Sequence, residues 1–84
     1  MQTPSYRKVY IDVYTLMRKD GTVLPGFFIW EDGEKHTIDH VLHITPAAPL
    51  KVGGRGIRYT AQISGRERYL FREDDRWFVE APIM

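Results

Sequence analysis

Three histidines and one aspartate between positions 36 and 43 are the side chains of this sequence best suited to metal binding or acid–base chemistry. Imidazole nitrogens and carboxylate oxygens are both competent metal ligands. In a strand, however, His36 and His40 share one face and stand about 13 Å apart. Asp39 and His43 point to the opposite face. We therefore expect no metal site here, and an enzyme or metal protein using these residues is the least favoured hypothesis.

A glycine-rich segment, GGRG at 53–56, is similar to phosphate-binding loops, in which glycines let backbone N–H groups approach an anion. A Walker loop continues with Lys-Ser or Lys-Thr into a helix, whereas this chain continues as IRYT, which is typical of a strand. No serine or threonine lies in a recognisable nucleophile motif. The sequence therefore predicts no catalytic residue, no enzyme activity and no cofactor.

Basic and aromatic residues are the main candidates for a binding surface. Small β-barrels bind single-stranded nucleic acid by stacking bases on aromatic rings and placing Lys and Arg along the phosphates. Between Asp39 and Glu67 the chain contains no acidic residue. The candidate binding residues are Lys51, Arg55, Arg58 and Arg66 for phosphates, and Trp30 and Trp77 for stacking.

Turn signals divide the chain into hairpins and so determine where these residues lie. They are Asp20-Gly21, Asp32-Gly33, Ser64-Gly65 and Asp74-Asp75. Short loops of this composition favour antiparallel neighbours. The expected strands are 8–16, 23–30, 35–44, one from Ile57, and two in the last hairpin. Pro25-Gly26 marks either a bulge or the true start of the second strand, and we expect pairing to begin at Phe27.

The length of the Asp32-Gly33 loop sets the faces of the second hairpin. A turn centred on this dipeptide pairs Ile29 with His36 and Phe28 with Thr37. Phe27, Ile29 and Ile38 then point toward the core, and Trp30 lies on the other face.

The Ser64-Gly65 loop decides in the same way which side chains of the following strand are buried. The odd residues from 57 to 63 line one face. A three-residue loop adds Tyr69 and Phe71 to that face, whereas a two-residue loop would bring Arg66 and Arg68 to it. We expect the three-residue loop, because it avoids burying arginines.

The last hairpin turns at Asp74-Asp75. This turn pairs Arg72 with Trp77 and Phe71 with Phe78. Both faces of the hairpin then carry large apolar groups, so the sheet curls over itself or its outer face meets a partner.

Composition limits the size of the domain and its setting. The chain has 84 residues, twelve Lys and Arg against eleven Asp and Glu, and a formal charge of +1, too small for strong overall attraction to nucleic acid. Without cysteine it has no disulfides, which indicates a reducing cytoplasm. No apolar run approaches the roughly 20 residues of a membrane span, so we expect no membrane insertion.

Three segments, GIRYT at 56–60, GRERYLF at 65–71 and RWFVE at 76–80, resemble a family of short bacterial proteins built around the same hairpins. The similarity extends from the first strand to the last. The family has no assigned activity. The resemblance therefore implies a compact all-β domain in a bacterial protein and transfers no functional residue.

Together these observations predict a single all-β domain over 1–84, with about six antiparallel strands in an SH3-like or partly open barrel. Residues 1–6 form a flexible tail, and 45–56 form a long loop of the kind that often carries function. The leading hypothesis is a non-catalytic interaction module that contacts a protein partner or a second copy through the outer apolar residues of the last hairpin. Single-stranded nucleic-acid binding is the alternative.

Overall fold

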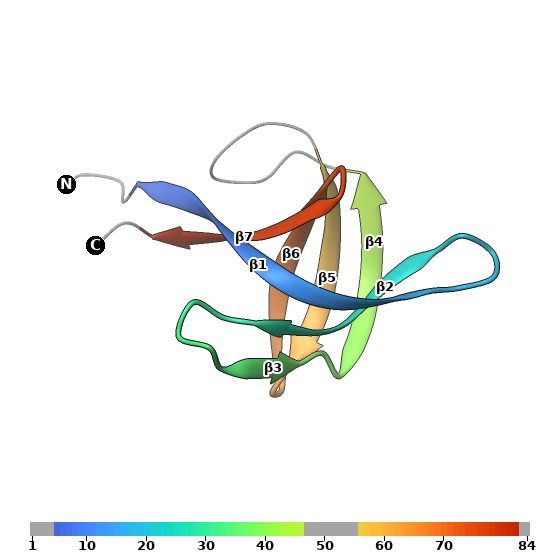
Figure 1. Ribbon diagram of the computed structural model, residues 1–84, viewed down its shortest axis with the longest axis horizontal. Helices are drawn as coiled ribbons and strands as arrows, with labels where there is room; N and C mark the ends of the chain where they lie inside the picture. Colours follow the sequence, from blue (N-terminus) through green and yellow to red (C-terminus); the bar gives the residue numbers. More distant parts are fainter. Residues whose placement is uncertain (1–4, 47–55, 83–84) are drawn as a thin grey trace.

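Seven antiparallel strands form one curled sheet in the computed structural model, which describes residues 5–46 and 56–82 (Figure 1). Their order across the sheet is β3-β2-β1-β7-β6-β5-β4, and the sheet closes about half of a barrel. No helix in the described ranges is long and apolar enough to cross a membrane. The strands are β1 (Tyr6–Met17), β2 (Val23–Ile29), β3 (Lys35–Thr37), β4 (His40–Pro46), β5 (Ile57–Ile63), β6 (Arg66–Glu73) and β7 (Arg76–Pro82).

The all-β prediction is confirmed. The strands extend further than predicted into the two segments expected to be irregular, the tail 1–6 and the loop 45–56. Tyr6, which the sequence placed in the tail, pairs with Pro82 in β7. The predicted loop 45–56 begins later, because β4 continues to Pro46. Most of that loop lies outside the described residues.

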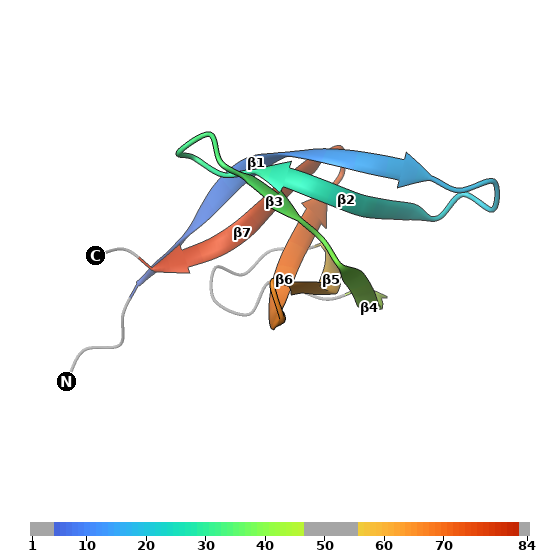
Figure 2. The ribbon, with the colours of Figure 1, turned by 90° about the horizontal axis from the view of Figure 1, so that it is seen from below.

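The long strand β1 connects the two halves of the sheet. Its first half pairs with β7, from Tyr6 to Ile11, and its second half pairs with β2, from Asp12 to Met17. The sheet bends between these halves, and Figure 2 shows β1 and β2 lying across the strands from β4 to β6. The inner faces of the two halves therefore pack on each other.

The predicted third strand is wrong as a single element, because two residues divide it into β3 and β4. Ile38 donates its backbone N–H to Gly26 O at 2.9 Å, and Asp39 donates to Gln62 O at 2.8 Å. These two residues thus lead the chain from the edge of β2 to the edge of β5. Burial of Ile38 in the core favours this change of direction, and it raises the strand number from six to seven.

A β-bulge at Gly26 changes which residues of β2 face inward. Tyr14 pairs with Phe27 and Thr15 with Pro25, so Gly26 is the extra residue. Pairing extends back to Val23, which makes the predicted start at Phe27 wrong; of the two interpretations of Pro25-Gly26, the structure has the bulge.

The second hairpin is shifted by one residue from its predicted register. Phe28 pairs with His36, because a three-residue loop closes on the hydrogen bond from Trp30 N–H to Glu34 O at 2.9 Å. Gly33 takes the positive φ of 85° that such a loop needs. The predicted inward face is confirmed for Ile38 and wrong for β2: Phe28 is buried, and Phe27 stacks outside on Tyr14 with ring centroids 4.3 Å apart.

The Ser64-Gly65 loop has two residues, which corrects the preference for three. Ser64 and Gly65 both have positive φ, 51° and 78°, as a type I′ turn requires. Arg66 therefore lies opposite Ile63, and Leu70 lies opposite Tyr59 on the inner face. The arginines remain exposed because this end of the half-barrel is open, so the burial argument against a two-residue loop does not apply.

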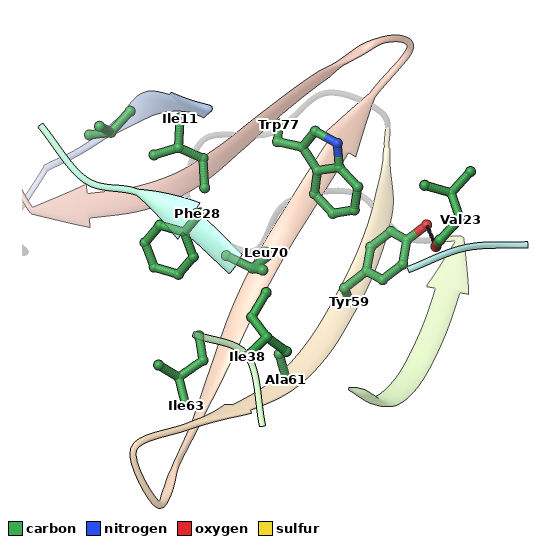
Figure 3. Close-up of a cluster of buried hydrophobic side chains, with 10 residues drawn as sticks. Ile11, Val23, Phe28, Ile38, Tyr59, Ala61, Ile63, Leu70 and Trp77 are labelled. Carbon is green, nitrogen blue, oxygen red and sulfur yellow. Dashed lines mark hydrogen bonds between the residues drawn. The ribbon is translucent and has the colours of Figure 1, made fainter. Parts of the chain in front are cut away.

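The core fills the space between the two halves of the sheet (Figure 3). As predicted, Tyr59, Ala61 and Ile63 are buried, and Trp77 lies against Tyr59 with ring centroids 4.7 Å apart. The Tyr59 hydroxyl donates to Val23 O at 2.9 Å and so connects β5 to β2. The remaining members of this inner cluster are Val9, Ile11, Val23, Phe28, Ile38 and Leu70.

The predicted registers of the last hairpin are confirmed at Phe71–Phe78 and Arg72–Trp77. Its apolar character on both faces is confirmed as well. Leu70 and Trp77 belong to the inner cluster, whereas Phe71 and Phe78 stack on each other at 5.3 Å and are fully buried.

Replacing Gly65 with alanine should lower the free energy of unfolding by about 1–2 kcal/mol, because an L side chain is strained at positive φ. Urea unfolding measures the change. Gly26→Ala is the matched control: its Cβ would meet only Tyr14 O at 3.4 Å, an ordinary contact, so we expect a change below about 0.5 kcal/mol. Equal losses in the two variants would contradict the turn assignment.

Tyr59→Phe should lower the free energy of unfolding by about 1–3 kcal/mol, because the buried Val23 carbonyl loses its hydroxyl donor while the ring stays in place. Thermal or urea unfolding gives the value. Tyr14→Phe is the control, since the Tyr14 ring is largely exposed on the other face. An unchanged stability in Tyr59→Phe would show that this hydrogen bond does not hold β5 to β2.

Candidate functional site

A groove opens where β6 and β7 separate. The two strands pair only near their turn, at Phe71–Phe78, Arg72–Trp77 and Glu73–Arg76. Beyond Phe71, β6 continues along β5 to Arg66, whereas β7 continues along β1 to Pro82. Both ribbon views show the two strands diverging from the turn (Figures 1 and 2).

The groove has a volume of about 850 Å³ and a mostly apolar floor. Phe28, Leu70 and Val79 contribute this floor from three different strands. The β2–β3 hairpin forms one wall with Trp30 and His36. The other bordering residues are Ile63, Ser64 and 66–69 from the β5–β6 hairpin, Phe71, and Tyr6, Glu80 and Ala81 from β1 and β7.

Local interactions hold the wall formed by the β2–β3 hairpin. Asp32 accepts the Glu34 backbone N–H at 2.8 Å, which stabilises the loop that positions Trp30. Trp30 is half-buried against the core, and the His36 ring stacks on Phe28 with centroids 5.1 Å apart. These rings thus border the groove from fixed positions.

Two arginines give the groove a positive rim. Arg66 and Arg68 are two residues apart on β6, so their side chains share the inner face, and both are exposed. Within residues 5–46 and 56–82 neither forms an ion pair, whereas Arg7 pairs with Glu31 and Arg76 with Glu73. Their charges are therefore available to an anionic group.

The candidate binding residues selected from the sequence do not form one surface. Arg66 and Trp30 both border the groove. Trp77 is 7% exposed and belongs to the core, so it cannot stack a nucleotide base. Arg58 lies on the opposite face of the sheet, with its guanidinium 5.0 Å from the centre of the Tyr69 ring. Lys51 and Arg55 lie outside the described residues.

The histidines and Asp39 have separate positions in the fold. His36 borders the groove, whereas His40 and His43 are exposed on β4. The Asp39 carboxylate accepts the Ser64 backbone N–H at 3.0 Å and so connects the β3–β4 link to the β5–β6 turn. In the described part of the chain, no three histidine or carboxylate side chains gather closely enough to hold a metal ion.

The outer apolar residues of the last hairpin, predicted to meet a partner, are not accessible. The predicted register placed Leu70 and Trp77 on that face, but both lie in the inner cluster. Phe71 and Phe78 lie on the outer face instead, and both have 0% exposure. Tyr10 packs edge-on against Phe78 at 5.8 Å, and the Lys8 ammonium lies 4.8 Å from the centre of the same ring. These covering side chains are held by Glu73, which accepts hydrogen bonds from Lys8 at 2.7 Å and Tyr10 at 3.1 Å.

Two groove residues, Phe28 and His36, were not among the binding residues selected from the sequence. Phe28 was expected on the other face, and His36 was considered only as a metal ligand. Arg68 belongs to the basic and aromatic residues that the sequence suggests for binding, but the preferred three-residue loop at Ser64-Gly65 directs it away from the inner face. The Ser64-Gly65 dipeptide itself carried the signal: both residues tolerate the positive φ of a two-residue type I′ loop, which brings Arg66 and Arg68 inward.

Comparison with models of known protein families gives no match, and comparisons with curated proteins and with solved structures give none either. The function is therefore argued from the geometry of this chain.

The contacts around Glu73 change its acidity and that of its partner. Hydrogen bonds from Lys8 and then Tyr10 hold the pKa of the Glu73 carboxyl below its ordinary value of 4.5. The same hydrogen bond holds the pKa of Lys8 above its ordinary value of 10.5. Because charged Glu73 is favoured in the folded state, it stabilises the fold above its ordinary pKa, and this stabilisation is lost as pH falls through the folded value.

Glu73→Gln should reduce stability at neutral pH and have little effect in strong acid. Urea-unfolding midpoints measured between about pH 7 and pH 2 should start lower for the variant and converge with the wild type at the acid end. Glu34→Gln, a change in the exposed β2–β3 loop, serves as the control and should follow the wild-type curve. Parallel curves for Glu73→Gln and wild type would contradict this role of the carboxylate.

Proposed function

We propose that this protein is a non-catalytic interaction module that binds an extended segment of another protein in the groove between β6 and β7. The observation that carries this proposal is the early separation of the two strands above an apolar floor. Binding sites commonly combine such a concave apolar surface with a few polar groups that orient the ligand. Arg66 and Arg68 supply those polar groups.

The shape and composition of the groove favour a polypeptide over a nucleic acid. A single strand of nucleic acid needs a continuous basic path and several exposed rings. Arg58 and Arg66 lie on opposite faces of the sheet, and Trp77 is buried, so the residues predicted for this function do not form such a path. Binding of single-stranded nucleic acid is therefore kept as an alternative result of the binding experiment below.

Contact through the last hairpin is also disfavoured as the basis of the interaction. Phe71 and Phe78 are covered by side chains of this same chain, so these two rings offer no surface to a second copy. The groove, by contrast, exposes the half-buried Trp30 ring beside unpaired cationic groups. Tryptophan and arginine are the residue types that most often dominate binding energy at protein interfaces.

Selection from a display library of random twelve-residue peptides tests the proposal. We expect enriched peptides that bind the purified protein and lose at least roughly tenfold in affinity with Trp30→Ala. Tyr14→Ala, on the projecting β1–β2 hairpin, is the control and should bind as the wild type does. Because Trp30 also packs on the core, chemical-shift mapping of a selected peptide on the wild-type protein gives a second measurement, with shifts expected at His36, Arg66 and Arg68.

Four results would overturn the proposal. One is a library that yields no binder, and another is a set of peptides whose shifts map to the β1–β2 hairpin. The third is tight, salt-dependent binding of labelled single-stranded DNA or RNA in place of peptide, since phosphate contacts make affinity fall steeply with salt. The last is a molecular mass that doubles with protein concentration because a second copy occupies the groove. The ligand would then be this same protein and not a separate partner.

A further inference from the structure

The edge of β6 that faces the groove has no strand beside it within the described ranges. On its other side β6 pairs with β5 from Arg66 to Arg72. In the two-residue hairpin, Arg66 exchanges hydrogen bonds with Ile63, so alternate residues from Arg66 use their backbone groups toward β5. Glu67 and Tyr69 therefore direct their backbone N–H and C=O groups toward the groove. This edge can accept an additional strand.

We propose that the segment bound in the groove adds as a β-strand to this edge of β6 and carries acidic residues at alternate positions, facing Arg66 and Arg68. The inference rests on the proposed function and specifies its ligand. Main-chain hydrogen bonds supply affinity in this mode of recognition, and alternate side chains supply specificity.

The two arginines determine the preferred charge pattern of the added strand. They lie on one face of β6, about 6.8 Å apart along the strand. A strand beside β6 places its own side chains directly opposite them at positions two residues apart, where opposite charges attract. The Glu67 side chain points to the other face, so it does not neutralise this pair.

The apolar floor of the groove determines which residue type should precede or follow the two acidic residues of the bound segment. Leu70 is the next inward residue after Arg68, but Leu70 and Phe28 are buried in the core, and the partly buried apolar residues that border the same space are Trp30 and Val79. An aromatic or large aliphatic residue two positions beyond the second acid can pack against the apolar surface that Trp30 and Val79 leave exposed. The expected ligand is thus an extended segment with one apolar and two acidic residues on a single face.

The outer edges of the sheet are poorer places for strand addition. β3 has only three residues, and the pairing of β4 with β5 shifts between Val41 and His43, which makes Leu42 a bulge. Short and bulged edges resist pairing with other chains. β6 is regular from Arg66 to Arg72 in its pairing with β5, and the first part of its other edge borders the groove.

Defined peptides test the inference in a direct binding titration. The probes are the acetylated peptides Trp-Val-Glu-Val-Glu-Val and the reversed Val-Glu-Val-Glu-Val-Trp, which cover antiparallel and parallel addition. We expect one of them to bind, and its affinity to fall at least about tenfold when both glutamates become glutamine. Arg66→Gln and Arg68→Gln should each weaken binding by roughly three- to tenfold, whereas the control Arg18→Gln, in the β1–β2 turn, should not.

Backbone methylation separates strand addition from a simple charge contact. In an antiparallel added strand the valine amides face β6 and the glutamate amides face away, whereas in a parallel strand the glutamate amides face β6. N-methylation of the set that faces β6, the valines of an antiparallel peptide or the glutamates of a parallel one, should abolish binding. N-methylation of the other set should cost less than about threefold. Three results would overturn the inference. They are an equal loss of affinity on N-methylation of either set of residues, failure of both peptides to bind at about 1 mM, and equal affinities of the glutamine and glutamate peptides. If peptides selected from the library still bound in the groove, the proposed function would be supported and only the strand-addition inference would be wrong. If no library peptide bound there, both the inference and the proposed function would be wrong.

Discussion

The curl of the sheet depends on the short link formed by Ile38 and Asp39. Their two backbone hydrogen bonds reach Gly26 on β2 and Gln62 on β5, so adjacent residues of the chain connect the two halves of the half-barrel. The Tyr59 hydroxyl bond to Val23 adds a side-chain connection between the same strands. With the halves held at this distance, Ile38 and the inner residues of β1, β2, β5, β6 and β7 form one core.

The same curl explains why a groove opens between β6 and β7. β7 pairs with β1 over six positions, from Tyr6–Pro82 to Ile11–Trp77, and β1 twists away from β6 as it joins the other half of the sheet. β7 cannot remain paired with both β1 and β6 along its whole length, so its pairing with β6 ends after three positions. The groove is therefore a consequence of the sheet geometry.

The convex face of the last hairpin shows the reverse arrangement, in which polar side chains protect apolar rings. Lys8, Tyr10 and Arg76 surround Glu73, and Lys8 and Tyr10 also lie against Phe78. The Arg76 guanidinium lies 4.2 Å from the Tyr10 ring centre. Apolar residues on two faces of a strand thus do not by themselves indicate a docking surface, because long side chains of neighbouring strands can cover one face.

The sequence by itself determined the all-β class, the hairpin turns, the inward face of β5 and the register of the last hairpin, because alternation and turn chemistry act over a few neighbouring residues. It also identified Trp30 and Arg66 as binding candidates. Only the tertiary structure decided the bulge at Gly26, the division at Ile38 and Asp39, and the inward positions of Phe28 and Arg68. A single residue of loop length or bulge exchanges the faces of a strand, and the choice depends on distant partners: Ile38 finds space in the core, and Arg68 finds solvent at the open end of the half-barrel.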